Sequence, residues 1–160
     1  MTERITEFKG DNSYLSNFSP HKIEYRGITY KTVEHAYQAQ KAMTARDFRA
    51  IVDCETPGEA KRMGREIQMD PDFEKNKVAI MYELIRAKFY YGHESHTWPL
   101  WWTLTSTLDA ELIEGNTWHD NFWGICSCSH CINFHTEGQS NMLGKTLMKV
   151  REEIDRENRR

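Results

Sequence analysis

The chain has 160 residues, and its 21 basic and 24 acidic side chains give it a formal net charge of −3. This length suits one compact domain, and so small a net charge excludes a general attraction to nucleic acid or to an anionic membrane. No apolar run approaches the ~18 residues of a membrane span, and the N-terminal stretch lacks the apolar segment of a signal peptide. We therefore expect a cytoplasmic protein with a single domain over residues 1–160 and a core at about residues 5–155.

The first half of the chain is predicted to form a hairpin followed by three helices. Residues 22–30 alternate apolar and polar side chains around an Arg-Gly turn, as a small β-hairpin does. Helices are predicted over residues 32–43, after Thr44, and over residues 56–67, and the last of these has a capping box and a proline at its first position. Gly64 lies inside that helix at a cost of ~1 kcal/mol relative to alanine, which indicates close approach of another backbone or a ligand.

The second half is predicted to contain a long helix from about Asp70 to Tyr90, a Trp-rich segment over 97–105, a short strand over 110–115 and a last helix after residue 140. Residues at helical spacing mark the inner faces of the two long helices. They are Met81, Leu84, Ile85, Lys88 and Phe89 in the first, and Leu143, Leu147, Val150 and Ile154 in the last. The predicted fold class is α+β, a mostly helical single domain with a small β-sheet.

Three polar side chains of the first helix, Glu34, Gln38 and Lys41, fall on one face, since positions i, i+4 and i+7 coincide around a helix. Amphipathicity alone predicts a polar face, so these residues could form the solvated side of a packed helix. The functional alternative is a carboxylate and an amine held at fixed spacing beside a pocket. The pattern by itself leaves both alternatives open.

Two loops place polar groups among aromatic residues. In the stretch YLSNF, Asn17 either forms an ordinary Asx turn or hydrogen-bonds a polar ligand while Phe18 packs on a ring. In the stretch NTWHDNFWG, Asp120 lies near Trp118 and Trp123, where a carboxyl group has a raised pKa unless it is hydrogen-bonded. This second loop is either a site of acid–base catalysis or a surface turn with aromatic residues beneath it.

Two places offer contacts to an anion such as phosphate. At the start of the last helix Ser140 or Asn141 can act as N-cap and Gly144 lies in the first turn, so free amides and the positive end of the helix dipole are available. The alternative there is a plain N-cap. Lys61 and Arg65, one helical turn apart, offer a second anion contact of low specificity.

Three cysteines gather in the stretch CSCSHCINFH, with two histidines among them. A disulfide framework is not expected without a secretory signal. Cys126, Cys128, Cys131 and His135 provide the thiolate and imidazole ligands of a tetrahedral Zn²⁺ site, and His130 is also near. The two alternatives at this point are a structural zinc and reduced thiols in a loop.

Taken together, these segments resemble the NADAR (YbiA-like) family. The matching segments are LSNF (15–18), ITYKTVEHAYQAQKA (28–42), TPGEAKRMGR (56–65), IMYELIRAKF (80–89), LIEG (112–115), DNFWG (120–124) and GQSNMLGKTLMKVREEI (138–154). Each motif is weak alone, whereas their joint order and spacing over nearly the whole chain are specific. The resemblance implies an α+β fold and an N-glycosidase that hydrolyses the bond between a ribose phosphate or ADP-ribose moiety and a nitrogen base. The implied substrates are ribosylamino-pyrimidine phosphates of the riboflavin pathway or ADP-ribosylated guanine in nucleic acid.

The resemblance also assigns residues by position. Glu34 and Lys41 match the family's E-H-x-x-Q-x-x-K helix, and Asp120 matches its D-x-x-W-G element. We expect Lys41 to act as nucleophile or charge stabiliser and Glu34 to transfer a proton or stabilise the cation, with Asp120 as its partner. Glu34 and Lys41 are expected to face the loop of Asp120. Substrate contacts are expected from Asn17, Phe18, Gln38, Lys61, Arg65, Trp118, Trp123, Gly124, Asn141 and Gly144.

This chemistry requires no metal or redox cofactor, so a zinc ion would be structural. The expected partner is a phosphorylated nucleotide-like substrate, and ADP-ribosylated nucleic acid is one candidate. No membrane partner is expected. The sequence indicates no oligomeric state. The stretch over residues 125–137 is longer than in the riboflavin-type members and is expected to reshape the pocket mouth. The alternative to an enzyme is a non-catalytic module that binds ADP-ribose or an NAD-type nucleotide.

Overall fold

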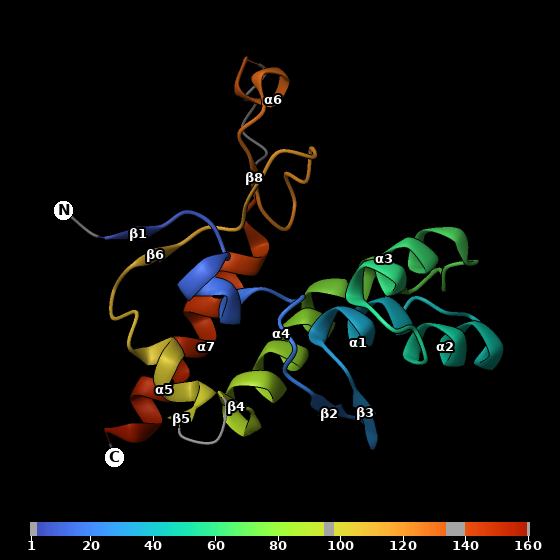
Figure 1. Cartoon of the computed structure of the whole chain (residues 1–160), viewed down its shortest axis with the longest axis horizontal. Helices are drawn as coiled ribbons and strands as arrows, with labels where there is room; N and C mark the ends of the chain where they lie inside the picture. The colour runs from blue at the N-terminus through green and yellow to red at the C-terminus, as the bar shows by residue number, and fades with distance from the viewer. Residues whose placement is uncertain (1–2, 95–97, 134–139, 160) are drawn as a thin grey trace. The chain divides into compact units, whose positions relative to one another are not determined.

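The computed structural model describes residues 3–94, 98–133 and 140–159 (Figure 1). In chain order its elements are β1 (Arg4–Ile5), η1 (Gly10–Leu15), β2 (Ile23–Tyr25), β3 (Ile28–Tyr30), α1 (Val33–Ala39), α2 (Ala45–Val52), α3 (Pro57–Glu66), α4 (Phe73–Tyr91), β4 (His93–Glu94), β5 (Trp98–Pro99), α5 (Leu100–Thr105), β6 (Glu111–Leu112), β7 (Gly115–Asn116), β8 (Ile125–Cys126), α6 (Ser129–Asn133) and α7 (Met142–Asn158). The predicted α+β class is confirmed, although the strands form separate two-stranded pairs in place of one small sheet.

Contacts divide the chain into two compact units. The central unit is Asn17–Leu100, and the terminal unit consists of the residues up to Ser16 and those from Trp101 onward. The described ranges contain no helix with the length and apolar character that crossing a membrane requires.

The predicted hairpin opens the central unit as β2 and β3, which pair antiparallel with Ile23 opposite Tyr30. Arg26 and Gly27 between them both have positive φ, 52° and 76°. Positive φ at both central residues is the type I′ geometry, whose twist matches that of the paired strands. Arg26 and Gly27, which the sequence predicts as the turn, therefore join the two strands.

Three helices of the central unit, α1, α2 and α3, begin where predicted because local side chains fix their first turns. At positions 32, 44 and 56 a threonine hydroxyl accepts a hydrogen bond from the backbone N–H three residues later. At the start of α3, a carboxylate oxygen of Glu59 accepts the Thr56 N–H and completes the capping box. Such caps satisfy amides that have no partner inside the helix.

The end of α1 differs from the prediction. The helix stops at Ala39 instead of residue 43, and Lys41 lies in the turn after it. The N–H of Asp70 donates to the Lys41 carbonyl over 2.8 Å. Ala42, which follows Lys41, forms an isolated β-bridge with Met69. A distant segment therefore ends the helix, which local periodicity does not reveal.

α1 is the centre of the central unit. It packs against α2, α3 and α4, and all seven of its residues are buried (Figure 1). α4 presents the predicted inner face, and Met81, Leu84, Ile85, Lys88 and Phe89 are all buried. A short helix enclosed on several sides buries its polar side chains together with its apolar ones, so those polar groups need partners inside the protein.

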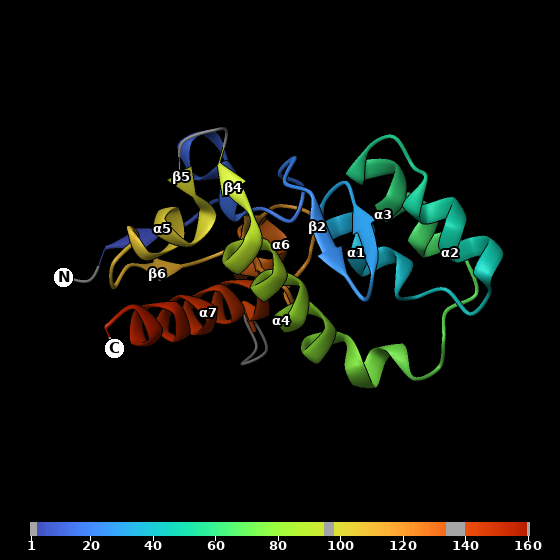
Figure 2. The same ribbon diagram turned by 90° about the horizontal axis from the view of Figure 1, so that it is seen from below.

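The terminal unit is built around α7. β1 pairs in parallel with β6, and β7 pairs in parallel with β8, so the strand predicted over 110–115 is two short strands. α7 lies along β6, as Figure 2 shows. The predicted apolar stripe is buried at Leu143, Leu147, Val150 and Ile154.

The start of α7 is fastened by Asn141, but not by the predicted side-chain cap. Asn141 has φ 44° and makes no capping hydrogen bond to the helix. Its Nδ2 donates to the Leu112 carbonyl over 2.8 Å, and its Oδ1 accepts the Glu114 N–H over 3.1 Å. Both ends of the amide are used to hold the strand segment against the helix start.

We expect Gly144→Ala to destabilise the terminal unit. A Cβ at position 144 would lie 2.0 Å from the Leu112 carbonyl oxygen and 2.5 Å from Asn141 Nδ2, and a backbone atom cannot move aside cheaply. Overpacking of this kind costs about 1–3 kcal/mol, more than the ~1 kcal/mol that alanine gains in a helix. Denaturant unfolding should show a lower midpoint; a midpoint equal to that of the wild type would contradict the close packing.

Candidate active site

Glu34 and Gln38 lie inside the central unit. Glu34 is 6% exposed and Gln38 is 3% exposed, so a solvated helix face is excluded for this pair. Gln38 Nε2 donates to Glu34 Oε1 over 2.7 Å. The donor in this hydrogen bond is a neutral amide, which orients the carboxyl oxygen but carries no positive charge. The carboxyl group of Glu34 is therefore fixed in position by Gln38.

Gly64 of α3 makes room for this pair. A Cβ at position 64 would lie 2.0 Å from Gln38 Oε1 and 2.9 Å from its Cδ, so the glutamine amide rests on the glycine. The close approach predicted at Gly64 is present, and it comes from a side chain of α1 rather than from a backbone or a ligand. Gln38 Oε1 has no hydrogen-bond partner among the described residues.

We expect Gly64→Ala to impair the site more than the fold. The new methyl group must displace the Gln38 amide and so break its hydrogen bond to Glu34. Gly58→Ala in the same helix is the matched control, since only Thr56 Oγ1, at 3.9 Å, lies near a Cβ there. The base release that the family resemblance implies should fall at least about tenfold for Gly64→Ala, in line with a misplaced catalytic group, and stay unchanged for Gly58→Ala. Equal rates in the two variants would count against a role for the Glu34–Gln38 contact.

Lys41 is half-buried in the turn that follows α1. Burial lowers the pKa of its amine below the ordinary value of 10.5, while Glu34 and Glu74 oppose this shift and the cations Lys61 and Arg65 add to it. The Lys41 Nζ lies 5.5 Å from the ring centre of Tyr37 and 5.6 Å from that of Phe73. These two rings pack edge to face with their centres 5.2 Å apart.

A lysine in this setting reaches its neutral form more readily than one in water. The neutral amine is the nucleophilic form, and a lowered pKa is how proteins activate lysine for attack on a sugar carbon or a carbonyl. Lys41 also lies in the electrostatic field of the Glu34 carboxylate, although it stands in the turn after α1 rather than on the helix face. The central unit thus brings together the two catalytic candidates of the opening helix.

The segment around Asn17 is joined to the start of α1. The Asn17 carbonyl accepts the Glu34 N–H over 3.1 Å, and Asn17 Nδ2 points to Met81 Sδ over 3.5 Å. Asn17 is 8% exposed, and its Oδ1 has no hydrogen-bond partner in the part of the chain that the structure describes. Lys88, which sequence reasoning places only on the inner face of α4, is fully buried and donates from Nζ to Ser19 Oγ over 2.6 Å.

Two buried acceptor oxygens, Asn17 Oδ1 and Gln38 Oε1, therefore lack a donor within the described residues. Buried polar atoms in native proteins are nearly always hydrogen-bonded, and an exception calls for an explanation such as a ligand. Both residues were predicted to contact substrate. Amino groups of a base or hydroxyl groups of a sugar are donors of the kind that would complete them.

The cation Lys61 and the aromatic ring of Phe18 lie together in the central unit. The Lys61 Nζ sits 5.6 Å from the centre of the Phe18 ring, and Phe18 is 41% exposed. Arg65 lies one turn further along α3 with an exposed side chain. An exposed ring with a cation over it offers stacking to a flat base and a charge to a phosphate.

The other catalytic candidate, Asp120, belongs to the terminal unit. Its Oδ1 accepts the N–H of Phe122 over 3.2 Å and that of Trp123 over 2.8 Å, so the carboxylate closes an Asx turn. Gly124, which ends this turn, is buried, and a Cβ there would lie 2.1 Å from the Glu114 carbonyl oxygen. The predicted partnership of Asp120 with Glu34 stays a prediction.

Trp118 and Trp123 have different surroundings within the terminal unit. Trp118 is 54% exposed and lines a cavity of about 410 Å³ together with Lys9 and Asn116. Trp123 is half-buried and packs edge to face on Phe122 with ring centres 4.9 Å apart. Of the two, Trp118 is the more exposed ring and the better candidate for stacking on a base.

The start of α7 offers fewer free amides than predicted. The N–H groups of Met142 and Leu143 donate to the carbonyls of Phe122 and Trp123, each over 3.0 Å. The phosphate site expected at this helix end loses these two donors, and the Asn141 side chain is likewise taken by the strand segment. The structure gives Asn141 and Gly144 packing roles instead.

The cysteine cluster has a histidine that sequence reasoning missed. Cys126, Cys128 and Cys131 lie together with His119, whereas the predicted fourth ligand, His135, lies outside the described residues. The sequence contains a sign of this fourth ligand, because His119 stands in the loop of Asp120, only seven residues before Cys126.

Comparisons with known proteins agree with this picture. Residues 6–155 match the family of the NADAR domain. An N-glycosidase of Nostoc punctiforme is 39% identical over 146 residues, which cover 88% of this chain and 84% of the relative. The chloroplastic riboflavin biosynthesis protein PYRR of Zea mays is 37% identical over 159 residues, but the match covers only 23% of that longer protein.

A solved structure is also similar. The N-glycosidase YbiA of Escherichia coli is 34% identical over 159 residues, which cover 96% of this chain and 91% of the relative. The NMR structure of the E. coli protein YbiA superposes with a TM-score of 0.77 at 32% identity and covers 99% of this chain and 89% of that one.

Proposed function

The chain belongs to the NADAR domain family, and from this premise we propose that it is an N-glycosidase that hydrolyses the bond between a ribose phosphate or ADP-ribose moiety and a nitrogen base. As an enzyme it is a hydrolase that acts on N-glycosyl compounds, like the relatives that carry the name N-glycosidase. The observation that carries the proposal is the buried Glu34–Gln38 pair beside a lysine with a lowered pKa.

Glu34 supplies the negative charge that this reaction needs. Breaking an N-glycosidic bond builds positive charge on the anomeric carbon of the sugar, as in the hydrolysis of O-glycosides. A buried carboxylate whose position is fixed by Gln38 stabilises that charge without having to reorganise. Glu34 can also take a proton from the attacking group or give one to the leaving base.

Lys41 acts as the nucleophile in this proposal. Its neutral amine attacks the anomeric carbon, the bond from that carbon to the base breaks, and the electron pair leaves with the base, which takes up a proton. Loss of a proton from the nitrogen and opening of the sugar ring give a Schiff base. Water then hydrolyses the Schiff base, which releases the sugar and restores the amine. The lowered pKa of Lys41 supports this role over a purely electrostatic one.

The remaining residues of the central unit bind the substrate. Phe18 stacks on the base, and Lys61 and Arg65 supply charge to the phosphate. Asn17 Oδ1 accepts a hydrogen bond from the base or the ribose, and Gln38 holds Glu34 beside them. Of the two substrate classes, the riboflavin-pathway intermediates have support from the name of the maize relative, while ADP-ribosylated guanine rests on the family resemblance.

The test is to incubate the protein separately with a ribosylamino-pyrimidine phosphate of the riboflavin pathway and with DNA that carries ADP-ribosylated guanine. Mass spectrometry of the free base is the readout. We expect catalytic release of base from one of the two. Tight binding of either compound without release from both would favour a nucleotide-binding module and overturn the proposal.

A further inference from the structure

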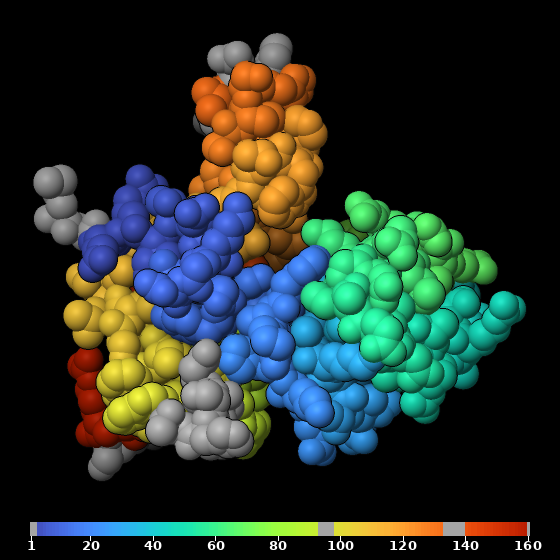
Figure 3. All heavy atoms as spheres, viewed as in Figure 1, coloured from blue at the N-terminus to red at the C-terminus, as the bar shows by residue number. Residues whose placement is uncertain are grey.

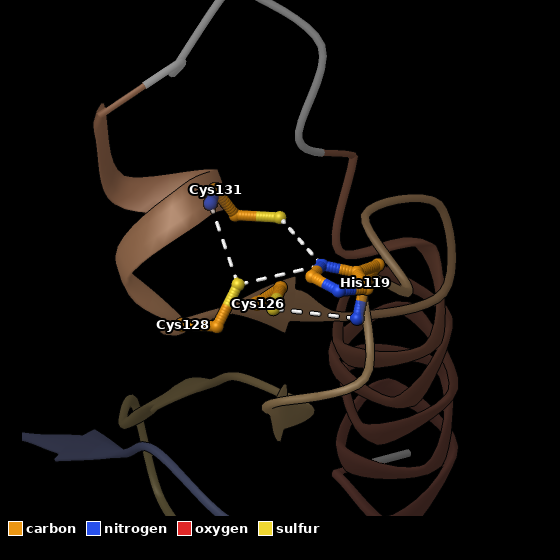
Figure 4. A group of neighbouring side chains, drawn as sticks. All are labelled: His119, Cys126, Cys128 and Cys131. Atoms are coloured by element: carbon orange, nitrogen blue, oxygen red, sulfur yellow. Dashed lines mark hydrogen bonds between the residues drawn. The ribbon is translucent and has the colours of Figure 1, made fainter.

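The geometry points to a structural zinc site in the terminal unit, and we propose that His119, Cys126, Cys128 and Cys131 bind one Zn²⁺. The ligand atoms of these four residues all lie within 4.8 Å of one another. Figure 4 shows the four side chains converging from the loop of His119, from β8 and from the chain around α6. Three cysteines and one histidine form a standard ligand set for structural zinc.

Two distances within the cluster match those of a tetrahedral zinc. His119 Nδ1 lies 3.4 Å from Cys131 Sγ and 3.3 Å from Cys128 Sγ. Zinc bonds of about 2.3 Å to sulfur and about 2.0 Å to nitrogen at the tetrahedral angle place nitrogen and sulfur about 3.5 Å apart. The side chains therefore need little movement to bind the ion.

Each sulfur also faces an N–H donor. The His119 N–H donates to Cys126 Sγ over 3.4 Å, and the Cys131 N–H donates to Cys128 Sγ over 3.3 Å. Asn121 Nδ2 donates to Cys131 Sγ over 3.3 Å. Three thiolates carry one more negative charge than Zn²⁺ neutralises, and donors aimed at the sulfurs offset that excess. Reduced thiols in an ordinary loop would not require one donor for each sulfur.

Among the described residues, the segment 116–133, which we call the cysteine lobe, buries no large aliphatic or aromatic side chain. Figure 3 shows its atoms, in orange, standing out from the rest of the terminal unit. Its large apolar side chains include Trp118 at 54% exposure and Ile132 at 52%, whereas Cys126 and Cys131 are buried. So short a segment buries too little apolar surface to fix its own shape, and a metal that joins its two ends supplies the missing constraint.

The zinc also fixes the turn that carries Asp120. His119 has φ 68°, a left-handed conformation that non-glycine residues adopt at a cost, and it stands directly before Asp120. Asn121 ties the same turn to the lobe from the other side, since its Oδ1 accepts the Cys126 N–H over 3.1 Å. This consequence for Asp120 rests on the proposed function, whereas metal binding itself does not.

The experiment is metal analysis of the whole protein, followed by titration of the zinc-free protein with Co²⁺. We expect about one zinc per chain in the purified protein. Co²⁺ should give the intense visible bands of a tetrahedral site and the near-ultraviolet bands of thiolate coordination. Wild-type protein that holds no zinc after purification and gives no such bands with Co²⁺ would overturn the proposal.

Variants test the ligand set. His119→Ala should weaken zinc binding by more than about 100-fold, beyond the loss that an outer-shell partner causes. His130→Ala is the matched control, because His130 packs edge to face on the His119 ring at 5.8 Å but contributes no ligand atom to the cluster. Cys54→Ser, in the central unit, should also keep full metal content. Loss of metal from His135→Ala with full retention in His119→Ala would show that this ligand set is wrong. If a ligand variant does not fold, the Co²⁺ bands of the wild type still show whether the cysteines bind a metal.

Discussion

Glu34→Gln is expected to lower kcat for base release by about 10²–10⁴-fold, the range that positioned proton-transfer groups contribute. The substitution keeps the size of the side chain and a hydrogen-bonding partner for Gln38, and it removes only the negative charge. Because the transition state carries positive charge on the sugar, loss of the carboxylate should raise the barrier while substrate binding changes little. Kinetics of free-base release by mass spectrometry provide the measurement.

Glu24→Gln, on the exposed face of β2, is the control and should behave like the wild type.

Glu34→Gln should also change the pH dependence of the residual activity. Glu34 raises the pKa of Lys41, so its removal lowers that pKa further. The acidic limb of the residual activity should therefore shift to lower pH. A variant with wild-type kcat would remove Glu34 from the mechanism.

Lys41→Met should lower kcat at least about 100-fold and abolish covalent trapping of the substrate by borohydride. Methionine keeps the contact with Tyr37 and Phe73 but has no amine. In the wild type, kcat/KM should rise with pH through the lowered pKa of Lys41 and then level off, because only the neutral amine attacks. Lys75→Met, at an exposed position of α4, is the control. Full activity in Lys41→Met would contradict the nucleophilic role.

The same variant should not be less stable than the wild type. The folded-state pKa of Lys41 is lowered, so at neutral pH the folded protein bears the cost of burying an ammonium group. Between the lowered pKa and 10.5 the unfolded chain binds more protons than the folded one, so wild-type stability rises with pH across that window. Any gain in unfolding temperature by Lys41→Met should therefore be present at neutral pH and shrink as the pH approaches 10.5. A structural lysine would behave in the opposite way.

The starts of α1, α2 and α3 were predictable from the sequence and the end of α1 was not, for a physical reason. A threonine at position 32, 44 or 56 acts on an N–H only three residues away, so its effect is visible in a short window. The end of α1 depends on Asp70, which donates to the Lys41 carbonyl from 29 residues further along the chain. No local pattern contains that information.

The candidate site was predictable in its residues more than in its contacts. The helical spacing placed Glu34, Gln38 and Lys41 together, but amphipathicity suggested a wet face as readily as a buried one. Burial of Glu34 and Gln38 follows from packing of α1 between its neighbours, which only the folded chain shows. Gly64 indicated a close approach in the sequence, but that the approaching group is the Gln38 side chain is visible only in the folded chain.

The start of α7 and the cysteine cluster show the same limit. Asn141 occupies a position where an N-cap is expected, yet its amide bonds to Leu112 and Glu114, which the strand pairing brings near. His119 joins the cysteines because a turn held by Asn116 folds its loop back onto them: Asn116 Oδ1 accepts the N–H groups of Trp118 and Asp120. Ligands from separate loops meet only after folding.

A single-turnover reaction with enzyme in excess over substrate tests the central claim most directly. Free base and sugar product are both quantified by mass for the wild type and for Glu34→Gln, with the substrate class that the protein turns over. The account predicts base and sugar in equal amounts from the wild type and almost none from Glu34→Gln over the same time. Intact substrate that stays bound to the wild type, or equal release by the two proteins, would contradict an N-glycosidase site built on the Glu34–Gln38 pair.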